Sequence, residues 1–350
     1  MTARRNRLLA ITLLALSVAA FARASELSAD LKARRARVME RLGPDAMLIL
    51  WSAPSQVYSR DVDYEYRQDS NLYYLTGIVQ EETLLVLMPG NESRREILFV
   101  KQKDPAQEHW RGLSLSAAEA QKHTGIETVL TTREFDSFVA AILGRRGFEP
   151  VDDKQAERFL AALSAGRARI HILLDPGHGL HDQLTPPLAF ARNIRDRFVG
   201  FHIDDAASIL ADLRLVKTPY ERKVLAKSVE ISNDGQRAGM LAARPGAYEY
   251  EVKAALEAVF RGRGAVSWAY PSIVASGPNA TILHYPHDDR QMQAGDLLLV
   301  DAGCNYGYMS ADVTRTYPVG GAFSPAQKDL YQIVLQAQEE GMKVAVPGSS

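Results

Sequence analysis

The sequence predicts two domains, an α/β domain followed by an α+β domain, and three observations lead to this prediction. The chain has 350 residues, which is enough for two domains of ordinary size. Its 46% hydrophobic and 24% charged residues are the balance of a globular protein. Short apolar runs mix with helix-like segments in the first half, whereas the second half opens with long helix-like segments. We therefore expect a leader at residues 1–24, a first domain at 25–175, a linker at 176–202 and a second domain at 203–350.

The first 24 residues have the pattern of a signal peptide. A basic segment, MTARRNR, precedes the apolar stretch LLAITLLALSVAAF, and the small residues ARA come just before Ser25. We expect cleavage after Ala24 and an exported protein, periplasmic or secreted. The alternative is a membrane anchor, which so short an apolar stretch would form poorly. No later segment is long and apolar enough to cross a membrane, so we expect no membrane attachment after cleavage.

The charge and the cysteine content exclude several classes of protein. The formal net charge is −1, and Lys and Arg are spread along the sequence, so no nucleic-acid partner is expected. Cys304 is the single cysteine, so an internal disulfide is excluded and the fold must be stabilised by its core. Because Cys304 ends a strand-like segment without a neighbouring His, we expect a small packed residue rather than a reactive thiol.

In the first half, a helix-like segment comes first and strands follow. LSADLKARRARVMERLG (27–43) carries apolar residues on one stripe, which predicts a helix. Pro, Gly and Asn bound the apolar runs that come next, as is typical of strands. The expected elements are strands in AMLILWS (46–52), TLLVLMP (83–89), EILFVKQ (96–102) and IHILLD (170–175), with a helix in REFDSFVAAILG (133–144). PGHGLHDQLTPP (176–187) is rich in turn-forming residues and is the best linker candidate.

The second half opens with two helices. In the first, over 217–243, Thr218 and Glu221 can form a capping box around Pro219. The second, over 250–264, has one apolar face. The remaining expected elements are strands in YPSIVASG (270–277), DLLLVDAG (296–303) and MSADVTRTYPV (309–319) and a helix in SPAQKDLYQIVLQAQEEGMKVAV (324–346).

Two aspartates lie inside these last strands, where carboxylates are uncommon. If residues 297–317 form a hairpin with Tyr306 and Gly307 at its tip, Asp301 lies directly opposite Asp312 on one face. Two carboxylates that close repel each other unless one is protonated or a cation lies between them. A pair of divalent ions would satisfy both, and oxygen ligands favour Mn²⁺ or a similar hard ion, with Zn²⁺ and Co²⁺ also open.

A plainer interpretation of the two aspartates stays open. Ser310 and Thr314 are polar too, so the hairpin could present a solvent-facing polar stripe at the edge of a sheet. A shift of one residue in the register would also move one Asp to the other face.

NATILHYPHDDR, residues 279–290, is the second candidate site. His284 and His287 are three residues apart, but the segment lacks the Glu of the H-E-x-x-H zinc motif. A histidine at the end of a strand is explained as well by a structural hydrogen bond as by catalysis, and both interpretations remain.

Taken together, five segments resemble the pita-bread metallopeptidases, in the branch that contains Xaa-Pro aminopeptidase (aminopeptidase P) and prolidase. RQDSNLYYLTG (67–77) and DPAQEHW (104–110) are similar to the N-terminal domain of that branch. NATILHY (279–285), GDLLLVDAG (295–303) and GYMSADVTRTYPVGGAFSPAQKDLY (307–331) are similar to the start of its catalytic domain. The resemblance implies a creatinase-like α/β N-terminal domain followed by the first part of an α+β pita-bread catalytic domain.

The resemblance also implies a site and a reaction. Asp301 and Asp312 match two metal ligands of a dinuclear centre that commonly holds Mn²⁺, and His284 matches a histidine that assists substrate binding and proton transfer. The implied reaction is hydrolysis of the bond between an N-terminal residue and a following proline, by a hydroxide that bridges the two metal ions. Peptides with proline at the second position are the implied substrates, and a homodimer or homotetramer is the implied assembly.

The sequence departs from the family's pattern in three ways. The family completes its site with a His in a Gly-rich H-x-x-G-H-G stretch, a second catalytic His and two later Glu residues, and none of these occurs before Ser350. Asp288 stands where relatives often have Asn. Two carboxylate ligands of five would bind two metal ions only weakly. We therefore expect a C-terminally truncated peptidase, and two alternatives remain: a prolidase, which cuts dipeptides only, and a non-catalytic peptide-binding protein on the same fold.

Overall fold

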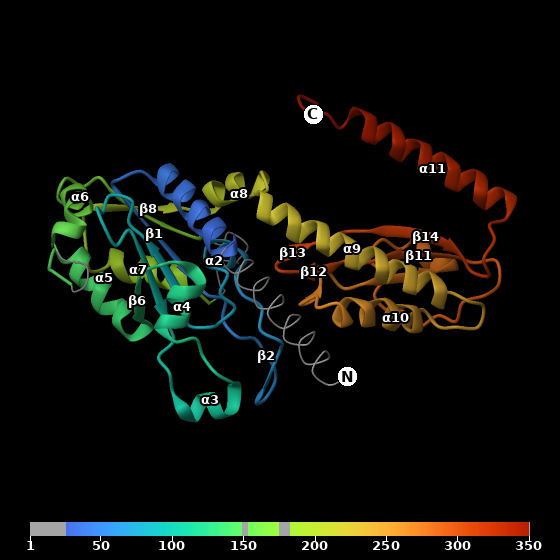
Figure 1. Cartoon of the computed structure of the whole chain (residues 1–350), viewed down its shortest axis with the longest axis horizontal. Coiled ribbons are helices and arrows are strands. Elements are labelled where there is room, and N and C mark those ends of the chain that lie inside the picture. Colours follow the sequence, from blue (N-terminus) through green and yellow to red (C-terminus); the bar gives the residue numbers. More distant parts are fainter. Residues whose placement is uncertain (1–25, 149–152, 175–182, 350) are drawn as a thin grey trace, which may run out of the picture. The chain divides into compact units, whose positions relative to one another are not determined.

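The computed structural model describes residues 26–148, 153–174 and 183–349. The expected leader at 1–24 lies outside these residues. Contacts divide the chain into two compact units, residues 1–220 and 221–350 (Figure 1). We describe each unit by itself.

The first unit is built on one six-stranded mixed sheet with the strand order β6-β5-β4-β1-β7-β8. β1 pairs antiparallel with β4 and parallel with β7, which places it in the middle of the sheet. The strands are β1 (Ala46–Trp51), β4 (Leu84–Leu87), β5 (Glu96–Val100), β6 (Thr128–Thr131), β7 (Ala168–Ile172) and β8 (Phe201–Asp205). The four strands expected in this half are all present. A separate short hairpin joins β2 (Val57–Ser59) to β3 (Val62–Asp63).

Both faces of this sheet are covered, and β1 shows why its sequence is apolar throughout. Successive side chains of a strand point to opposite faces. Met47 and Ile49 enter one hydrophobic cluster, whereas Leu48 and Leu50 enter the other. The first cluster takes residues from α5 (Phe135–Leu143), α6 (Asp153–Ser164) and α7 (Pro186–Arg195); the second takes them from the helix at 26–42, α2 (Ser70–Thr76), α4 (Ala117–Thr124) and α8 (Ala207–Leu215). The α/β prediction for this half is confirmed.

The structure differs from the linker expected at 176–202. That segment contains all of α7, and β8 begins within it and pairs in parallel with β7. Pro186 and Pro187 are typical of turns, but proline also suits the first turn of a helix, and they begin α7. Ala191 and Ile194 then bury the apolar side of α7 against the sheet. The first unit therefore continues beyond residue 175 and ends at Tyr220.

The second unit packs two helices against small antiparallel sheets. α9 (Pro219–Ala242) and α10 (Glu249–Gly262) share a core with the sheet β10-β11-β14, made of Ile273–Ser276, Leu297–Asp301 and Thr314–Pro318. A second sheet, β13-β12-β9, consists of Met309–Ser310, Cys304–Tyr306 and Ser267–Trp268. Cys304 is fully buried in the core, as expected for a packed residue.

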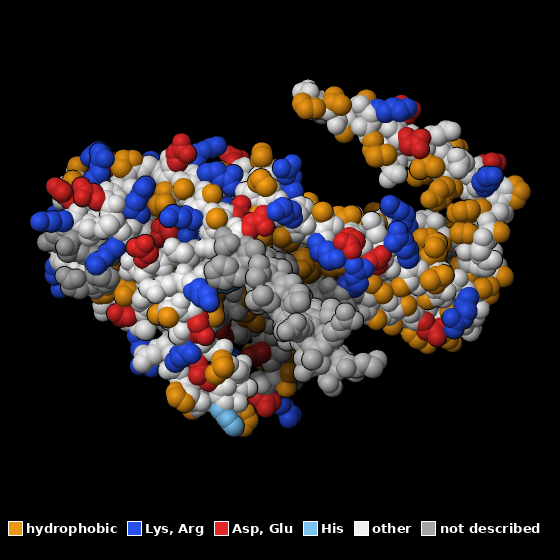
Figure 2. Space-filling view, in the orientation of Figure 1, with side chains coloured by type: hydrophobic (Ala, Val, Ile, Leu, Met, Phe, Trp, Pro, Cys, Tyr) orange, Lys and Arg blue, Asp and Glu red, His pale blue; other side chains and the backbone are white. Residues whose placement is uncertain are grey.

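The last helix, α11 (Pro325–Val344), begins at the expected cap, Ser324, but has no buried residue. Its large apolar side chains recur along the helix and are exposed (Figure 2). The exposed residues are Leu330, Ile333, Val334, Met342 and Val344. No described residue covers this face of α11.

The hairpin that carries the two aspartates has a different register from the one expected. Asp301 pairs with Thr314 rather than with Asp312. The turn lies one residue later, at Gly307 and Tyr308, which both have positive φ, as two-residue hairpin turns favour. Because the pairing moves by two residues and side chains alternate with a period of two, Asp312 stays on the same face as Asp301.

Gly303 makes this hairpin possible because the opposite strand passes directly beside it. A Cβ atom at this position would lie 1.9 Å from the carbonyl oxygen of Ala311. We expect Gly303→Ala to lower the free energy of unfolding by about 3 kcal/mol, since the two backbones must separate. Urea denaturation measures this loss. The control is Gly262→Ala, where a Cβ meets no atom, and a similar loss in that variant would contradict the explanation.

Candidate metal centre

Asp301 and Asp312 approach the same tyrosine hydroxyl. Tyr270 Oη lies 2.5 Å from Asp301 Oδ1 and 2.9 Å from Asp312 Oδ1. The two carboxylate oxygens are therefore no further apart than the sum of these distances. Asp301 is the last residue of β11, and Asp312 lies just before β14. The structure brings together two residues that the sequence analysis proposed as a pair, although not in directly opposed positions.

The phenol cannot satisfy both carboxylates fully. A tyrosine hydroxyl has one proton to donate. Burial, followed by the hydrogen bonds to Asp301 and Asp312, raises the pKa of Tyr270 above its usual value, so the hydroxyl stays protonated. Two negative groups thus share one donor, and a cation between them would relieve their repulsion.

Sequence reasoning missed Tyr270. It lies between β9 and β10, in a segment without a recognisable motif, 31 residues before Asp301. Its only signal in the sequence is an aromatic residue before a proline. Its role became visible only when the fold placed it against the hairpin.

His284 is exposed in a turn that follows the short 3₁₀ helix η2 (Gly277–Thr281). It forms no hydrogen bond with the described residues, so the structural explanation for this histidine finds no support. Its neighbour Tyr285 is buried and packs on Ile273 and Ala275 of β10. Ile273 is paired with Asp301, and paired residues share a face of the sheet. The segment that carries His284 therefore folds over the face that carries Asp301.

Asp288 has a defined role in this segment. It has φ of 55°, a left-handed conformation in which Asn and Asp are enriched. Its buried carboxylate accepts a hydrogen bond from Lys253 Nζ at 2.7 Å and lies 3.3 Å from the Val274 amide. Asp288 thus supplies a charge for Lys253 while keeping the backbone shape that an Asn would adopt.

The donor set fits a hard cation in part. Carboxylate oxygens are the ligands that Mn²⁺ and similar ions prefer. Within residues 26–148, 153–174 and 183–349, however, no group of three or more His, Cys, Asp and Glu side chains could hold a metal ion. Asp301 and Asp312 therefore offer two carboxylates between which a cation could bind, but they do not form a complete coordination sphere.

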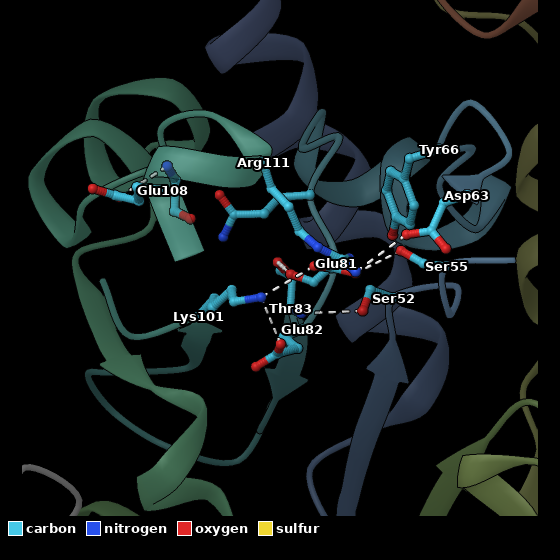
Figure 3. Close-up of polar contacts among 12 residues, drawn as sticks. Ser52, Ser55, Asp63, Tyr66, Glu81, Glu82, Thr83, Lys101, Glu108 and Arg111 are labelled. Carbon is cyan, nitrogen blue, oxygen red and sulfur yellow. Dashed lines mark hydrogen bonds and ion pairs between the residues drawn. The ribbon is translucent and has the colours of Figure 1, made fainter. Parts of the chain in front are cut away.

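A second polar cluster lies in the first unit, around Glu81 (Figure 3). Glu81 accepts hydrogen bonds from Ser55 Oγ at 2.5 Å and Lys101 Nζ at 3.1 Å, and Arg111 lies 3.5 Å away. Arg111 also pairs with Asp63. Glu81, Lys101 and Arg111 border a cavity of about 400 Å³. Since Lys101 and Arg111 both have carboxylate partners, the cluster is an ion-pair network that ties the β2–β3 hairpin and α3 (Pro105–Arg111) to the sheet.

The network predicts a pH dependence of stability. The Ser55 hydrogen bond, together with the hydrogen bond and the charge of Lys101, outweighs the effect of burial and holds the pKa of Glu81 below its usual value of 4.5. A lowered pKa stabilises the fold above the unfolded-state pKa, and this contribution disappears as the pH falls through the folded-state pKa. We expect Glu81→Gln to cost about 1–2 kcal/mol at neutral pH and progressively less below pH 4.5. Urea denaturation over this pH range measures the difference in stability between Glu81→Gln and the wild type. Glu40→Gln, the same change at an exposed residue, is the control. A loss of stability that does not depend on pH would contradict the prediction.

Residues 223–350 match the model of metallopeptidase family M24, and residues 31–149 match the model of the aminopeptidase P N-terminal domain. The Xaa-Pro aminopeptidase of Haemophilus influenzae is 32% identical over 322 residues, which are 92% of this chain and 68% of that relative.

Solved structures give the same result. The chain is similar to aminopeptidase PepP of Pseudomonas aeruginosa with a TM-score of 0.78 and 32% identity, over 92% of this chain and 68% of that one. It is similar to aminopeptidase P of Escherichia coli solved with the inhibitor Pro-Leu, with a TM-score of 0.75 and 29% identity, over 89% of this chain and 67% of that one. A zinc-substituted form of the E. coli enzyme in complex with product is also similar, with a TM-score of 0.76 and 27% identity, over 92% of this chain and 69% of that one.

The two matched domains occur in the order that the sequence predicts, and the expected fold, an aminopeptidase P N-terminal domain followed by a pita-bread domain, is confirmed. Together with the identity to relatives along most of the chain, these matches establish its relationship. The chain therefore belongs to metallopeptidase family M24, in its Xaa-Pro aminopeptidase branch.

Proposed function

We propose that this protein is a Xaa-Pro aminopeptidase that hydrolyses the bond between an N-terminal residue and a following proline with the help of two divalent metal ions. The observation that carries the proposal is the convergence of Asp301 and Asp312 on Tyr270, on the face of the sheet over which the His284 segment folds. Zinc in the substituted E. coli enzyme and Pro-Leu as its inhibitor support the metal and the substrate class.

The residues of this chain have distinct proposed roles. Asp301 and Asp312 would hold the metal ions, with Mn²⁺ as the first choice among hard ions. The metal ions, when bound, supply activation of water and polarisation of the scissile carbonyl. Tyr270 donates to whichever carboxylate carries the larger charge and so keeps both directed to the same point. His284, exposed and without a hydrogen bond, is free to bind the substrate and to move a proton.

Proline at the second position is a demanding requirement. Its amide nitrogen carries no hydrogen, so a site that relies on that donor cannot orient the bond. A pocket for the ring must do so instead.

The test is hydrolysis of the tripeptides Xaa-Pro-Xaa and Xaa-Ala-Xaa with and without added Mn²⁺. We expect Mn²⁺-dependent release of the first residue from the proline peptide alone. Cleavage of Xaa-Pro dipeptides but not of tripeptides would instead indicate a prolidase. Equal cleavage of both tripeptides, or cleavage that chelators leave unchanged, would contradict the proposal.

One observation favours a second candidate function. The described residues hold two carboxylate ligands at the centre and no third ligand. With two of the five ligands that the resemblance implies, metal ions would bind weakly, and the chain could still bind peptides without cleaving them. Calorimetric titration with an Xaa-Pro peptide in the presence of a chelator separates the two: metal-independent binding without turnover supports the non-catalytic protein.

Location and assembly are further proposals. Within the described part of the chain, no helix combines the length and the hydrophobicity needed to cross a membrane. On the pattern of residues 1–24 we propose export to the periplasm or the medium, with the first residue of the mature chain at Ser25. N-terminal sequencing of the mature protein checks this, and an intact Met1 would contradict it.

We also propose a homodimer or homotetramer, which light scattering in solution would distinguish from a monomer.

A further inference from the structure

Glu249, the first residue of α10, is a fully buried carboxylate. Burying a charge is costly unless hydrogen bonds compensate it. Glu249 Oε1 accepts from the Ser276 amide at 2.6 Å, from Ser276 Oγ at 2.7 Å and from Asn279 Nδ2 at 3.3 Å. Glu249 Oε2 accepts from the Arg290 amide at 3.1 Å. Its position in the first turn of a helix adds favourable interaction with the helix dipole.

The partners of Glu249 lie at the two ends of one segment. Ser276 is the last residue of β10, and Arg290 follows the turn-rich stretch that carries His284. The Arg290 guanidinium reinforces the closure, because its Nη1 donates to Ser276 Oγ at 2.7 Å and to Asp296 at 2.6 Å. One carboxylate therefore holds both ends of the segment 277–289 together.

Tyr285 anchors the inside of the segment. Its hydroxyl donates to Asp289 Oδ1 at 3.3 Å, and burial raises the pKa of Tyr285 to about 12. Tyr285 packs on Ile273 and Ala275, and Ile273 is paired with Asp301 in the sheet. His284 is adjacent to Tyr285, so its place above the sheet depends on the same closure.

We propose that Glu249 is a positioning residue that clamps the segment 277–289 and thereby holds His284 over the face of the sheet that carries Asp301. The catalytic consequence rests on the role that the proposed function gives to His284. Glu249 itself is neither a metal ligand nor a catalytic residue, because both of its oxygens are occupied by donors at the two ends of the segment.

Glu249→Gln is the informative variant because it keeps the size of the side chain. The glutamine oxygen can still accept from Ser276, but its NH₂ group then faces the Arg290 amide, donor against donor. Glu257→Gln is the matched control: it is the same change on the same helix, at a residue outside this hydrogen-bond network.

Hydrogen exchange tests the clamp without any need for activity. We expect the amides of residues 279–290 to exchange about tenfold faster or more in Glu249→Gln, while those of α9 and β11 keep their protection. Glu257→Gln should leave all of them unchanged. Unaltered exchange in Glu249→Gln would overturn the proposal, and so would an equal acceleration throughout residues 221–349, which would indicate general destabilisation.

Kinetics test whether Glu249 acts through His284. We expect Glu249→Gln to lower kcat by about 10–100-fold with KM changed less than about threefold. In a His284→Ala background the same substitution should lower kcat by less than about threefold, because the group it positions is already gone. An equal loss in both backgrounds would overturn the proposal. If the wild-type chain shows no Mn²⁺-dependent cleavage, the proposed function fails, and the exchange experiment decides the role of Glu249 alone.

Discussion

Asp301→Asn is expected to weaken Mn²⁺ binding about tenfold or more and to lower kcat/KM on an Xaa-Pro peptide about 100-fold or more, because changes even to outer-shell groups reach this size. The carboxylate lost is one of two that converge on Tyr270. Removing it also removes the repulsion between the two in the metal-free protein. The metal-free variant should therefore melt at the same temperature as the wild type or higher, while the rise in Tm on adding Mn²⁺ becomes smaller.

Thermal melting with and without Mn²⁺ and peptide hydrolysis check this result. The control is Asp329→Asn, the same change at an exposed position of α11. Equal Mn²⁺ responses of the Asp301→Asn variant and the wild type would show that the pair is the polar stripe of the plainer interpretation.

Arg35→Leu is expected to lower the free energy of unfolding of the first unit by about 3–5 kcal/mol, the cost of breaking a buried ion pair. Arg35 is completely buried on the helix at 26–42. Its guanidinium donates to the carbonyl oxygen of Leu75 at 2.8 Å and to that of Thr124 at 2.9 Å, and it lies 3.1 Å from Glu96. The two carbonyls lie in the last turns of α2 and α4, where a positive charge is favourable, so leucine would leave three acceptors without their donor.

Urea denaturation followed by circular dichroism measures this loss. The matched control is Arg41→Leu, on the same helix but exposed, where surface substitutions change stability by about 0.5 kcal/mol or less. A similar loss in both variants would mean that the helix, and not the buried guanidinium, carries the stabilisation.

Several elements could be predicted from the local sequence pattern alone. β1 is apolar at every position since both faces of its sheet are covered, and α11 begins where Ser324 and Pro325 predict it. The linker expected at 176–202 does not match the structure, because its prolines are compatible with two local structures. Pro186 and Pro187 suit a turn and the first turn of a helix equally well, and only the burial of Ile194 against the sheet decides between them.

The register of the Asp301 hairpin could not be predicted from the sequence pattern. Pairings that differ by two residues leave the same side chains on the same faces, so alternation of polar and apolar residues cannot separate them. The turn at Gly307 and Tyr308 and the close passage of Ala311 beside Gly303 select one of the two.

By itself, the sequence determined the family, the two domains, and the two aspartates and the histidine proposed for the site, because these depend on residue types at fixed spacing along one segment. The tertiary structure decided what surrounds them. Tyr270 reaches Asp301 across 31 positions, and Glu249 reaches Ser276 across 27 and Arg290 across 41. Contacts over such separations form only when the core brings the segments together, and no local pattern in the sequence marks either residue in advance.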